Sequence, residues 1–307
     1  MSFLEKKGFI WMDNEFVPWG DAKVHVLTHT LHYGTGVFEG LRAYKTAKGP
    51  AIFRLEEHTD RLFRSAHLLN MHIPFSKEIL NEGQLEVIRK NKLEAAYIRP
   101  MVYYGAESLG LRARGMKTHV MIAAWEWGTY LGPESRVKGI RVCTSSYQRN
   151  HVNSVLSKAK ANGNYMNSIL ALHDAQFNGY DEALLLDQSG FVAEGSAENF
   201  FMVRNGIIHT PDLTAVLEGV TRDTICLLAE HLGYTVKETR ITRDAVYLAD
   251  EAFFTGTAAE VTPIRELDGR LIGNGERGPV THKLQDAFHE LVNGKSKFHP
   301  EWLTYVS

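Results

Sequence analysis

Residues 154–168 read SVLSKAKANGNYMNS, a stretch that sets two lysines, Lys158 and Lys160, among small side chains directly before a Gly-Asn-Tyr sequence. A solvated surface lysine needs no such neighbours, whereas a lysine that forms a Schiff base needs space beside its amine and groups that hold its partner. Alternate residues of a strand share one face, so on a strand both lysines would point the same way. The stretch therefore predicts a reactive lysine and leaves open which of the two it is.

The length, charge and cysteine content of the chain limit which kinds of molecule it can be expected to bind. The chain has 307 residues, enough for one large or two medium domains, and its net charge of -2 provides no attraction to nucleic acid or to an anionic membrane. No long apolar run and no targeting segment is visible. Cys143 and Cys226 lie in no CxxC spacing, which predicts thiols in a reducing compartment. We expect a cytoplasmic protein whose partners are small molecules or copies of itself.

The first part of the chain has the pattern of a mixed α+β unit. Two short strands are expected around a turn at Asp13-Asn14, a third strand over 22–27, helices over 54–70 and 76–93, and strands over 95–105 and 118–128. Residues 132–138 concentrate glycine, proline and charge, and are predicted to be a linker. The predicted domains are therefore 1–131, which is the smaller, and 139–307.

The second part alternates strands and helices. A strand is expected over 140–147, a helix over 163–179, hairpins over 182–195 and 199–212, a helix over 220–234 with Thr221 at its N-cap, a strand over 250–256 and a helix over 280–294. The predicted fold class is α+β, built from two mixed α/β domains.

Two segments have features of a phosphate site. In EGVTRD, Gly219 lets the backbone approach a ligand, and Thr221 opens a helix whose free amides attract an anion. In TGTAAEV, Gly256 and Thr257 follow a buried strand, and the alanines after them suggest the start of another helical turn. An ordinary capped helix is the alternative in both places.

An amine and an acid complete the requirements of pyridoxal phosphate. This cofactor needs a lysine, an anion site and an acid beside its pyridine nitrogen. Glu194, in VAEGSAENFF, precedes a glycine that leaves room for close approach, and Glu198 is the competing candidate.

The segments AKANGNY, EGSAENFF, EGVTRD and GTAAEVTP, in this order, resemble the branched-chain aminotransferases, which are pyridoxal-phosphate enzymes of fold type IV. The resemblance extends through HYGTGVFEGLRAY, RLEEHTDRL, YIRP and WEWGTYLG, and so covers nearly the whole chain. It implies the fold type IV architecture, with a substrate pocket in the first domain and cofactor binding in the second. It also implies transfer of an amino group between leucine, isoleucine or valine and 2-oxoglutarate, in a ping-pong reaction.

The resemblance assigns roles to residues of the cofactor site. Lys160 looks like the Schiff-base lysine that forms the internal aldimine and shuttles the proton, Tyr165 like the partner of the phenolic oxygen, and Glu194 like the partner of the pyridine nitrogen. Arg61 looks like a phosphate ligand. The implied cofactor ligands are Arg61, Lys160, Tyr165, Glu194, Leu217, Val220, Thr221, Gly256 and Thr257.

The substrate residues are implied in the same way. An aromatic wall would suit a branched side chain, and Arg99 looks like the residue that accepts the distal carboxylate of glutamate. Tyr33 and the loop ESLGLRARG, which is more basic than the family pattern, resemble parts that reach a neighbouring subunit's pocket. A homodimer is therefore implied, and a hexamer of three dimers is compatible with it. The implied substrate residues are Tyr33, Phe38, Gly40, Tyr97, Arg99, Leu109, Leu111, Trp127, Tyr130, Thr257 and Ala258.

The sequence also contains features that could indicate other functions. His25, His29 and His32 form an HxxxHxxH array that could hold a metal on a helix, but no carboxylate stands where a hydrolase would place its base, and Gly34 breaks the helix. We expect no metal. GTGVFEG is not the glycine pattern of dinucleotide binding. A D-amino-acid aminotransferase and a lyase acting on an aminochorismate share the cofactor and remain alternatives.

Overall fold

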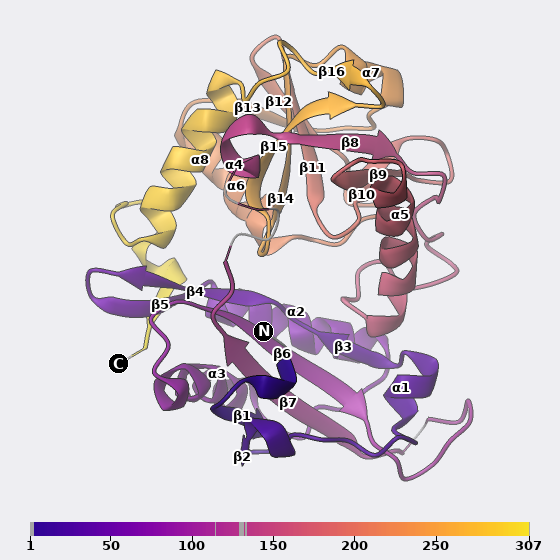
Figure 1. Cartoon of the computed structure of the whole chain (residues 1–307), viewed down its shortest axis with the longest axis vertical. Coiled ribbons are helices and arrows are strands. Elements are labelled where there is room, and N and C mark those ends of the chain that lie inside the picture. The colour runs from indigo at the N-terminus through magenta and orange to yellow at the C-terminus, as the bar shows by residue number, and fades with distance from the viewer. Residues whose placement is uncertain (1–2, 114, 129–131, 133, 307) are drawn as a thin grey trace. The chain divides into compact units, whose positions relative to one another are not determined.

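The computed structural model describes residues 3–113, 115–128, 132 and 134–306. The chain packs as two compact units, whose elements are labelled in Figure 1. The first unit comprises Met1–Trp127, Ala159–Gly163 and Leu291–Ser307, and the second comprises Gly128–Lys158 and Asn164–Glu290. The predicted limits at 131 and 139 differ from this division because two later segments pack with the first unit. The domain limits at 131 and 139 therefore stay a prediction.

The first unit is built on a sheet of eight strands in the order β17-β5-β4-β6-β7-β1-β2, with β3 paired to β6. Helices α2 and α3 pack against each other and against this sheet (Figure 1). Its strands are β1 (Phe9–Met12), β2 (Glu15–Pro18), β3 (Gly36–Phe38), β4 (Leu41–Thr46), β5 (Gly49–Phe53), β6 (Ala96–Tyr104), β7 (Thr118–Trp125) and β17 (Leu303–Tyr305), and its helices are α1 (His29–Tyr33), α2 (Leu55–Leu68) and α3 (Lys77–Asn91).

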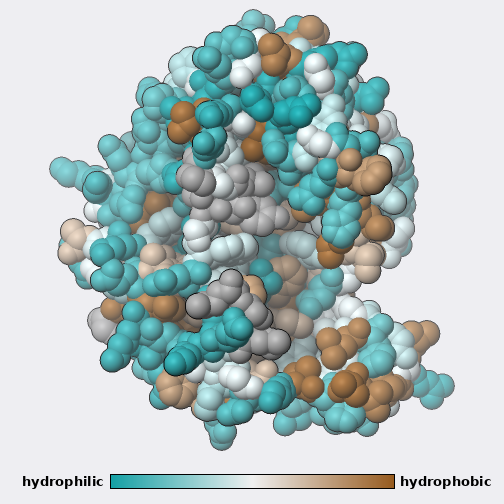
Figure 2. Space-filling view, in the orientation of Figure 1, coloured by the Kyte–Doolittle hydropathy of each residue, from teal (hydrophilic) through white to brown (hydrophobic). Residues whose placement is uncertain are grey.

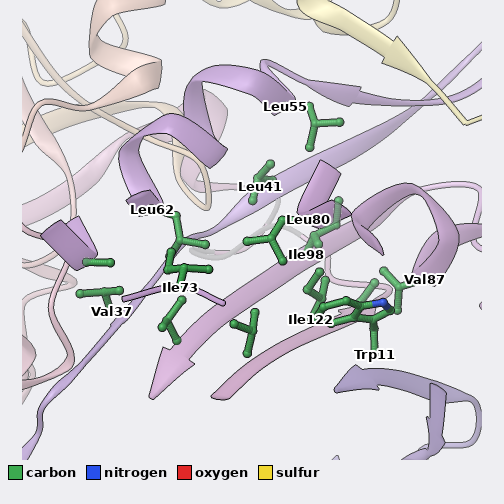
Figure 3. Close-up of a cluster of buried hydrophobic side chains, with 14 of the residues drawn as sticks. Trp11, Val37, Leu41, Leu55, Leu62, Ile73, Leu80, Val87, Ile98 and Ile122 are labelled. Atoms are coloured by element: carbon green, nitrogen blue, oxygen red, sulfur yellow. The ribbon is translucent and has the colours of Figure 1, made fainter. Parts of the chain in front are cut away.

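The core of the first unit joins both helices to the sheet. Figure 3 shows Leu62 of α2 and Leu80 of α3 among Leu41, Ile98 and Ile122 of the strands, and all five side chains are fully buried. Each such burial contributes about 1.5–3 kcal/mol. The apolar residues of α2 recur on one face, which is why this segment is a helix that packs on a sheet.

The structure confirms most of the predicted elements of this unit, with one error. The turn at Asp13-Asn14, both long helices and the strands at 95–105 and 118–128 are present. Residues 22–27 form no strand, and Val24 and Val26 are exposed. Their alternating pattern resembles a strand, but no neighbouring strand pairs with them in the described part of the chain.

The second unit contains a sheet of nine strands in the order β10-β9-β8-β15-β14-β11-β12-β13, with β16 on β15. Because β10 also pairs with β11, the path from β10 through β15 to β11 closes into a ring. Its strands are β8 (Ile140–Thr144), β9 (Glu182–Leu186), β10 (Val192–Gly195), β11 (Asn199–Arg204), β12 (Ile207–Thr210), β13 (Thr235–Glu238), β14 (Glu251–Gly256), β15 (Glu260–Leu267) and β16 (Arg270–Leu271).

Helices cover this ring. Helix α5 packs on β9 and α6 packs near β13 and β14, and the small buried residues of α5, Ala171 and Ala175, allow its close approach. No helix among the described residues is both long enough and apolar enough to span a bilayer. The helices are α4 (Ser135–Lys138), α5 (Tyr165–Phe177), α6 (Val220–His231), α7 (Arg243–Tyr247) and α8 (Pro279–Val292), which leads into the C-terminal segment.

Three local predictions for the second half of the chain were wrong. Gly219, not Thr221, is the N-cap of α6, so Thr221 lies in its first turn. The alanines after Thr257 form a hairpin turn between β14 and β15 instead of a helical turn, because Gly256 pairs with Glu260. The lysines of the opening stretch lie in a loop and on no strand.

Candidate active site

The backbone on both sides of Lys160 is held by the first unit. Its N–H donates to Ser65 Oγ of α2 at 3.0 Å, and its carbonyl accepts from the N–H of Phe38 at 3.0 Å. The next residue, Ala161, bridges to Val37 of β3. The Lys160 amine lies 5.0 Å from the centre of the Phe38 ring, a favourable place for a cation. A short loop segment thus fixes a lysine between a helix and a strand.

Lys158 has different neighbours, all in the second unit. Its amine donates to the carbonyl of Leu213, lies 3.4 Å from the Val216 carbonyl and pairs with Glu218 Oε1 at 3.4 Å. An amine that is bound by two carbonyls and a carboxylate has its donor positions occupied by structural contacts. The surroundings of the two lysines therefore favour Lys160 as the reactive one.

Arg61 belongs to a buried network of charges. Its Nε donates to Glu39 Oε1 at 2.6 Å and its Nη2 donates to Glu39 Oε2 at 2.9 Å. His58 Nδ1 lies 2.8 Å from Glu39 Oε2. Burial raises the pKa of Glu39, but the Arg61 charge and the hydrogen bonds from His58 and Arg61 outweigh it and hold that pKa far below its usual range. Burial lowers the pKa of His58.

This network fixes the orientation of Arg61, the predicted phosphate ligand. Glu39 is fully buried, and a buried carboxylate that binds a guanidinium through both oxygens fixes its orientation. Periodicity gave Arg61 no special role, and Glu39 and His58 were not predicted at all. Glu39 lies in the GVFEG segment and His58 in the EEHTDR segment, 19 residues later in the chain, so only the fold brings the two side chains together.

The predicted substrate residues of the first unit lie close together. Arg99 donates from Nη2 to the Tyr97 hydroxyl at 3.0 Å, and its guanidinium lies 4.6 Å from the Phe38 ring centre. The rings of Tyr97 and Trp127 meet edge to face at 4.4 Å. A Cβ at Gly40 would come within 2.1 Å of the Tyr97 hydroxyl, so this position requires glycine. Aromatic rings and one cation thus gather at the start of β6 and around β3.

Three other predicted substrate residues lie at the surface of this unit. Tyr33 ends α1, and Leu109 and Leu111 lie in the loop between β6 and β7, where Leu111 is 91% exposed. Figure 2 shows hydrophobic side chains gathered over α1 and this loop. Tyr130, the last predicted member of the aromatic wall, lies outside the described residues.

Glu194 is held from several sides in the second unit. Arg149 Nε pairs with Glu194 Oε1 at 2.7 Å, Asn199 Nδ2 donates to Oε2 at 3.3 Å, and the N–H of Leu217 lies 3.4 Å from Oε2. An ion pair and two amide donors stabilise the ionised form of a buried carboxylate. Sequence reasoning missed Arg149 and Asn199, because a lone arginine in a loop and an asparagine at the start of a strand give no local signal.

The predicted anion-binding segments lie in the same unit as Glu194. Val220 and Thr221 form the first turn of α6, and the N-terminus of a helix attracts anions. A Cβ at Gly219 would come within 2.0 Å of Asn199 Oδ1, so the helix start packs against the side chain that also binds Glu194. Gly256, Thr257 and Ala258 lie at the β14–β15 turn, and Tyr165 is the first residue of α5.

The groups described above have the chemistry that the implied cofactor, pyridoxal phosphate, needs. A lysine amine, a fixed carboxylate and a helix N-terminus are the groups that an aldehyde, a pyridine nitrogen and a phosphate need. The side-chain oxygen of buried Thr255, beside the β14–β15 turn, makes no hydrogen bond within the described residues. Glu198, the alternative to Glu194, has a carboxylate oxygen 3.0 Å from the N–H of Ala197, within its own turn.

The histidine array has no metal-site geometry. His29 Nε2 lies 2.9 Å from the Gly110 carbonyl, and His32 Nε2 lies 2.9 Å from the Val26 carbonyl. The N–H of Leu27 donates to His25 Nδ1 at 3.1 Å. Each ring therefore binds backbone atoms near it, and the described part of the chain contains no cluster of three potential metal ligands.

Comparison with known proteins places the chain in a family. Residues 36–267 match the family model described as amino-transferase class IV. The branched-chain-amino-acid aminotransferase of Pseudomonas aeruginosa is 60% identical over 306 residues, which is 100% of both chains.

Solved structures agree with this relative. The branched-chain amino acid aminotransferase of Escherichia coli superposes with a TM-score of 0.96 at 45% identity, covering 98% of this chain and 100% of the other. That of Thermobaculum terrenum, determined in its PLP form, superposes with a TM-score of 0.92 at 36% identity, covering 99% of both chains. The full-length similarity in sequence and structure means that the chain belongs to the class IV aminotransferases, and within them to the branched-chain-amino-acid aminotransferase family.

Proposed function

We propose that the protein is a pyridoxal-phosphate-dependent transaminase that moves the amino group between leucine, isoleucine or valine and 2-oxoglutarate. The observation that supports this most directly is Lys160, an amine beside the Phe38 ring whose backbone is held by α2 and β3. Membership of the branched-chain aminotransferase family supports the same activity.

Pyridoxal phosphate supplies a carbon that carries the amino group between half-reactions and a ring that draws electrons from the substrate α-carbon. Lys160 Nζ binds this cofactor and moves the proton at the substrate α-carbon as general base and then general acid. Glu194 keeps its negative charge beside the ring nitrogen, because Arg149 and two amides hold it ionised.

The remaining ligands orient the cofactor. Arg61, Val220, Thr221, Gly256 and Thr257 bind its phosphate, and Tyr165 donates to its phenolic oxygen. Leu217 contributes through its backbone, which already contacts Glu194. A helix N-terminus and a buried arginine suit a dianion because both supply fixed positive charge.

The first unit sets the choice of substrate. Phe38, Tyr97 and Trp127 offer apolar ring surface to a branched side chain, with Gly40 leaving the space that the Tyr97 hydroxyl occupies. Arg99 pairs with the distal carboxylate of the second substrate, and Thr257 and Ala258 bind the α-carboxylate.

We further propose a homodimer as the minimal unit in the cytoplasm. Leu111, Leu109 and Tyr33 expose apolar surface on the first unit, which a second copy of the chain would cover. In this assembly the loop after β6 completes the pocket of the neighbouring subunit. Residues 1–131 would then supply most of the substrate pocket and 139–307 most of the cofactor ligands, and three dimers could assemble into a hexamer.

The near-visible absorption spectrum of the purified protein tests the function. We expect a cofactor band that falls when leucine is added and returns with 2-oxoglutarate. Absence of a band even after addition of pyridoxal phosphate would overturn the proposal. A band that ignores leucine would instead favour the D-amino-acid aminotransferase or the lyase, and D-alanine and an aminochorismate would then separate these two.

A further inference from the structure

The turn between β14 and β15 contains an unusual backbone position. Gly256 pairs with Glu260 across the turn, and Glu260 has a φ of 56°. Hairpin turns are often closed by a residue in this left-handed conformation, which glycine adopts most readily. A glutamate is disfavoured there because its Cβ approaches the following carbonyl.

Other turns of the second unit use residues that tolerate this conformation. Asn205, at φ 51°, and Asp268, at φ 52°, have short polar side chains that populate the left-handed region several-fold more than most residues. Glu260 lacks this tolerance and lies in the turn of the predicted anion site. Backbone exceptions of this kind cluster at functional sites, where surrounding contacts hold them.

The surrounding contacts of Glu260 are visible. Its carboxylate, only 8% exposed, lies 3.5 Å from Arg136 Nη2 of α4. The same Nη2 donates to His289 Nδ1 of α8 at 3.1 Å. Gln285 Nε2, also of α8, donates to the carbonyls of Arg136 at 3.1 Å and of Val261 at 2.8 Å. Arg136 and the start of β15 are thus fixed to one helix.

A second contact holds the same end of the turn. The hydroxyl of Thr262 donates to the carbonyl of Ala259 at 2.8 Å, within the buried start of β15. The Thr262 hydrogen bond and the Glu260–Arg136 pair therefore both hold the chain where the turn enters β15.

We infer that Glu260 is a positioning residue for anion binding at the β14–β15 turn. Its pairing with Arg136 holds residue 260 in the left-handed conformation and so orients the amides of Thr257 and Ala258 toward an anion. The inference rests on the proposed function, in which that anion is the cofactor phosphate or the substrate carboxylate. Glu260 itself touches neither.

Glu260→Gly separates this role from simple turn formation. Glycine suits the backbone conformation but lacks the carboxylate, so we expect the melting temperature of the apoprotein to stay the same or rise by about 2 °C. The dissociation constant of pyridoxal phosphate, or the KM for leucine and 2-oxoglutarate, should rise by about tenfold. Stability and binding would therefore change in opposite directions, which a turn residue alone would not produce.

The two binding measurements identify the anion. A weaker titration of the apoprotein with pyridoxal phosphate indicates the phosphate, whereas a higher KM with unchanged cofactor binding indicates the substrate carboxylate. Arg136→Gln should reproduce the binding defect, and combining it with Glu260→Gly should add little. Unchanged constants in Glu260→Gly would overturn the inference.

Asn205→Gly is the matched control, because it relieves a similar backbone conformation in the hairpin between β11 and β12. Its binding constants should equal those of the wild type. If Glu260→Gly does not fold, Glu260→Asn replaces it, since asparagine tolerates the left-handed region. An inactive wild-type protein would refute the proposed function, whereas an active wild type with a normal Glu260→Gly variant would refute only this inference.

Discussion

Lys160 and Lys158 are two residues apart in the chain, yet their side chains have different surroundings. We predict that Lys160→Ala lowers kcat by about 1,000-fold or more, because a positioned acid–base group is lost together with the covalent link. Lys158→Ala should keep most of the activity and lose some stability. Steady-state kinetics with leucine and 2-oxoglutarate measure both, and the reverse result would assign the chemistry to Lys158.

Glu39 allows a second prediction for a single residue. Glu39→Gln leaves the buried Arg61 without its charged partner, so the free energy of unfolding should fall by about 3–5 kcal/mol. Urea unfolding of the apoprotein measures the change. Glu57→Gln is the control, since Glu57 pairs with Arg54 at 2.8 Å but is partly exposed, and it should cost less than about 1 kcal/mol. Equal losses in the two variants would contradict a special role for the Glu39 network.

Glu182 predicts a pH dependence of stability. Burial is the main cause that raises its pKa from 4.5 to about 7, although the Ala183 amide and Ser196 donate to it. Between these two values the folded state binds more protons than the unfolded state, so this carboxyl lowers stability as the pH rises. Glu182→Gln should therefore be more stable relative to wild type at pH 8 than at pH 4.

Thermal unfolding of Glu182→Gln and wild type across this range measures that difference. Glu134→Gln serves as the control, because Glu134 lies at the surface and pairs with Lys138. A stability difference that does not grow with pH would show that Glu182 keeps an ordinary pKa in the folded protein.

Among the secondary-structure elements, the start of α6 packs against Asn199, whose side chain binds Glu194, the predicted partner of the ring nitrogen. Gly219 has a φ of -71°, which alanine also adopts, but a new Cβ would displace the Asn199 amide that binds Glu194 and the Leu217 carbonyl. We predict that Gly219→Ala weakens the binding of pyridoxal phosphate by about tenfold. Spectroscopic titration of the apoprotein measures this constant.

Gly20→Ala is the control for this substitution. A Cβ at Gly20 would meet no atom within 4 Å, so the same glycine-to-alanine substitution displaces no neighbouring side chain there. Its cofactor affinity should match that of the wild type. If Gly219→Ala also binds the cofactor normally, Asn199 can move without disturbing Glu194.

At the scale of the whole molecule, the C-terminal segment completes the first unit. Strand β17 pairs with β5, the N–H of Arg54 donates to the Trp302 carbonyl at 2.7 Å, and the Arg54 guanidinium lies 4.4 Å from the Trp302 ring. The strand at one edge of the first sheet is therefore supplied by the end of the chain. Such long-range pairing slows folding because a long loop must close first.

Trp302→Ala tests this organisation. Removal of the buried ring should lower the free energy of unfolding by about 3–5 kcal/mol. Chemical denaturation measures the loss, and near-ultraviolet circular dichroism reports the packing of the first unit. Leu271→Ala, at an exposed position, should change stability by less than about 0.5 kcal/mol. A small effect of Trp302→Ala would show that the segment is dispensable for the fold.

The family, the α+β class and most of the elements can be predicted from the sequence. Long helices such as α2 and α3 carry a clear apolar periodicity, and the Asn205-Gly206 turn has its own local chemistry, so both are encoded within a few residues. Family motifs spread over the chain identified Lys160 and Glu194 as candidates. Their roles in catalysis stay predictions.

Which residues support these candidates depends on the fold. Arg149 beside Glu194, and Glu39 with His58 around Arg61, come from distant segments, and no local pattern relates them. The fold also overrode local pattern at 22–27, where alternating residues have no partner strand among the described residues, and at Glu260, where a glutamate stands in a conformation that suits glycine. Propensity acts over neighbouring residues, whereas ion pairs, strand partners and buried charges depend on which distant segments the fold brings within a few ångströms.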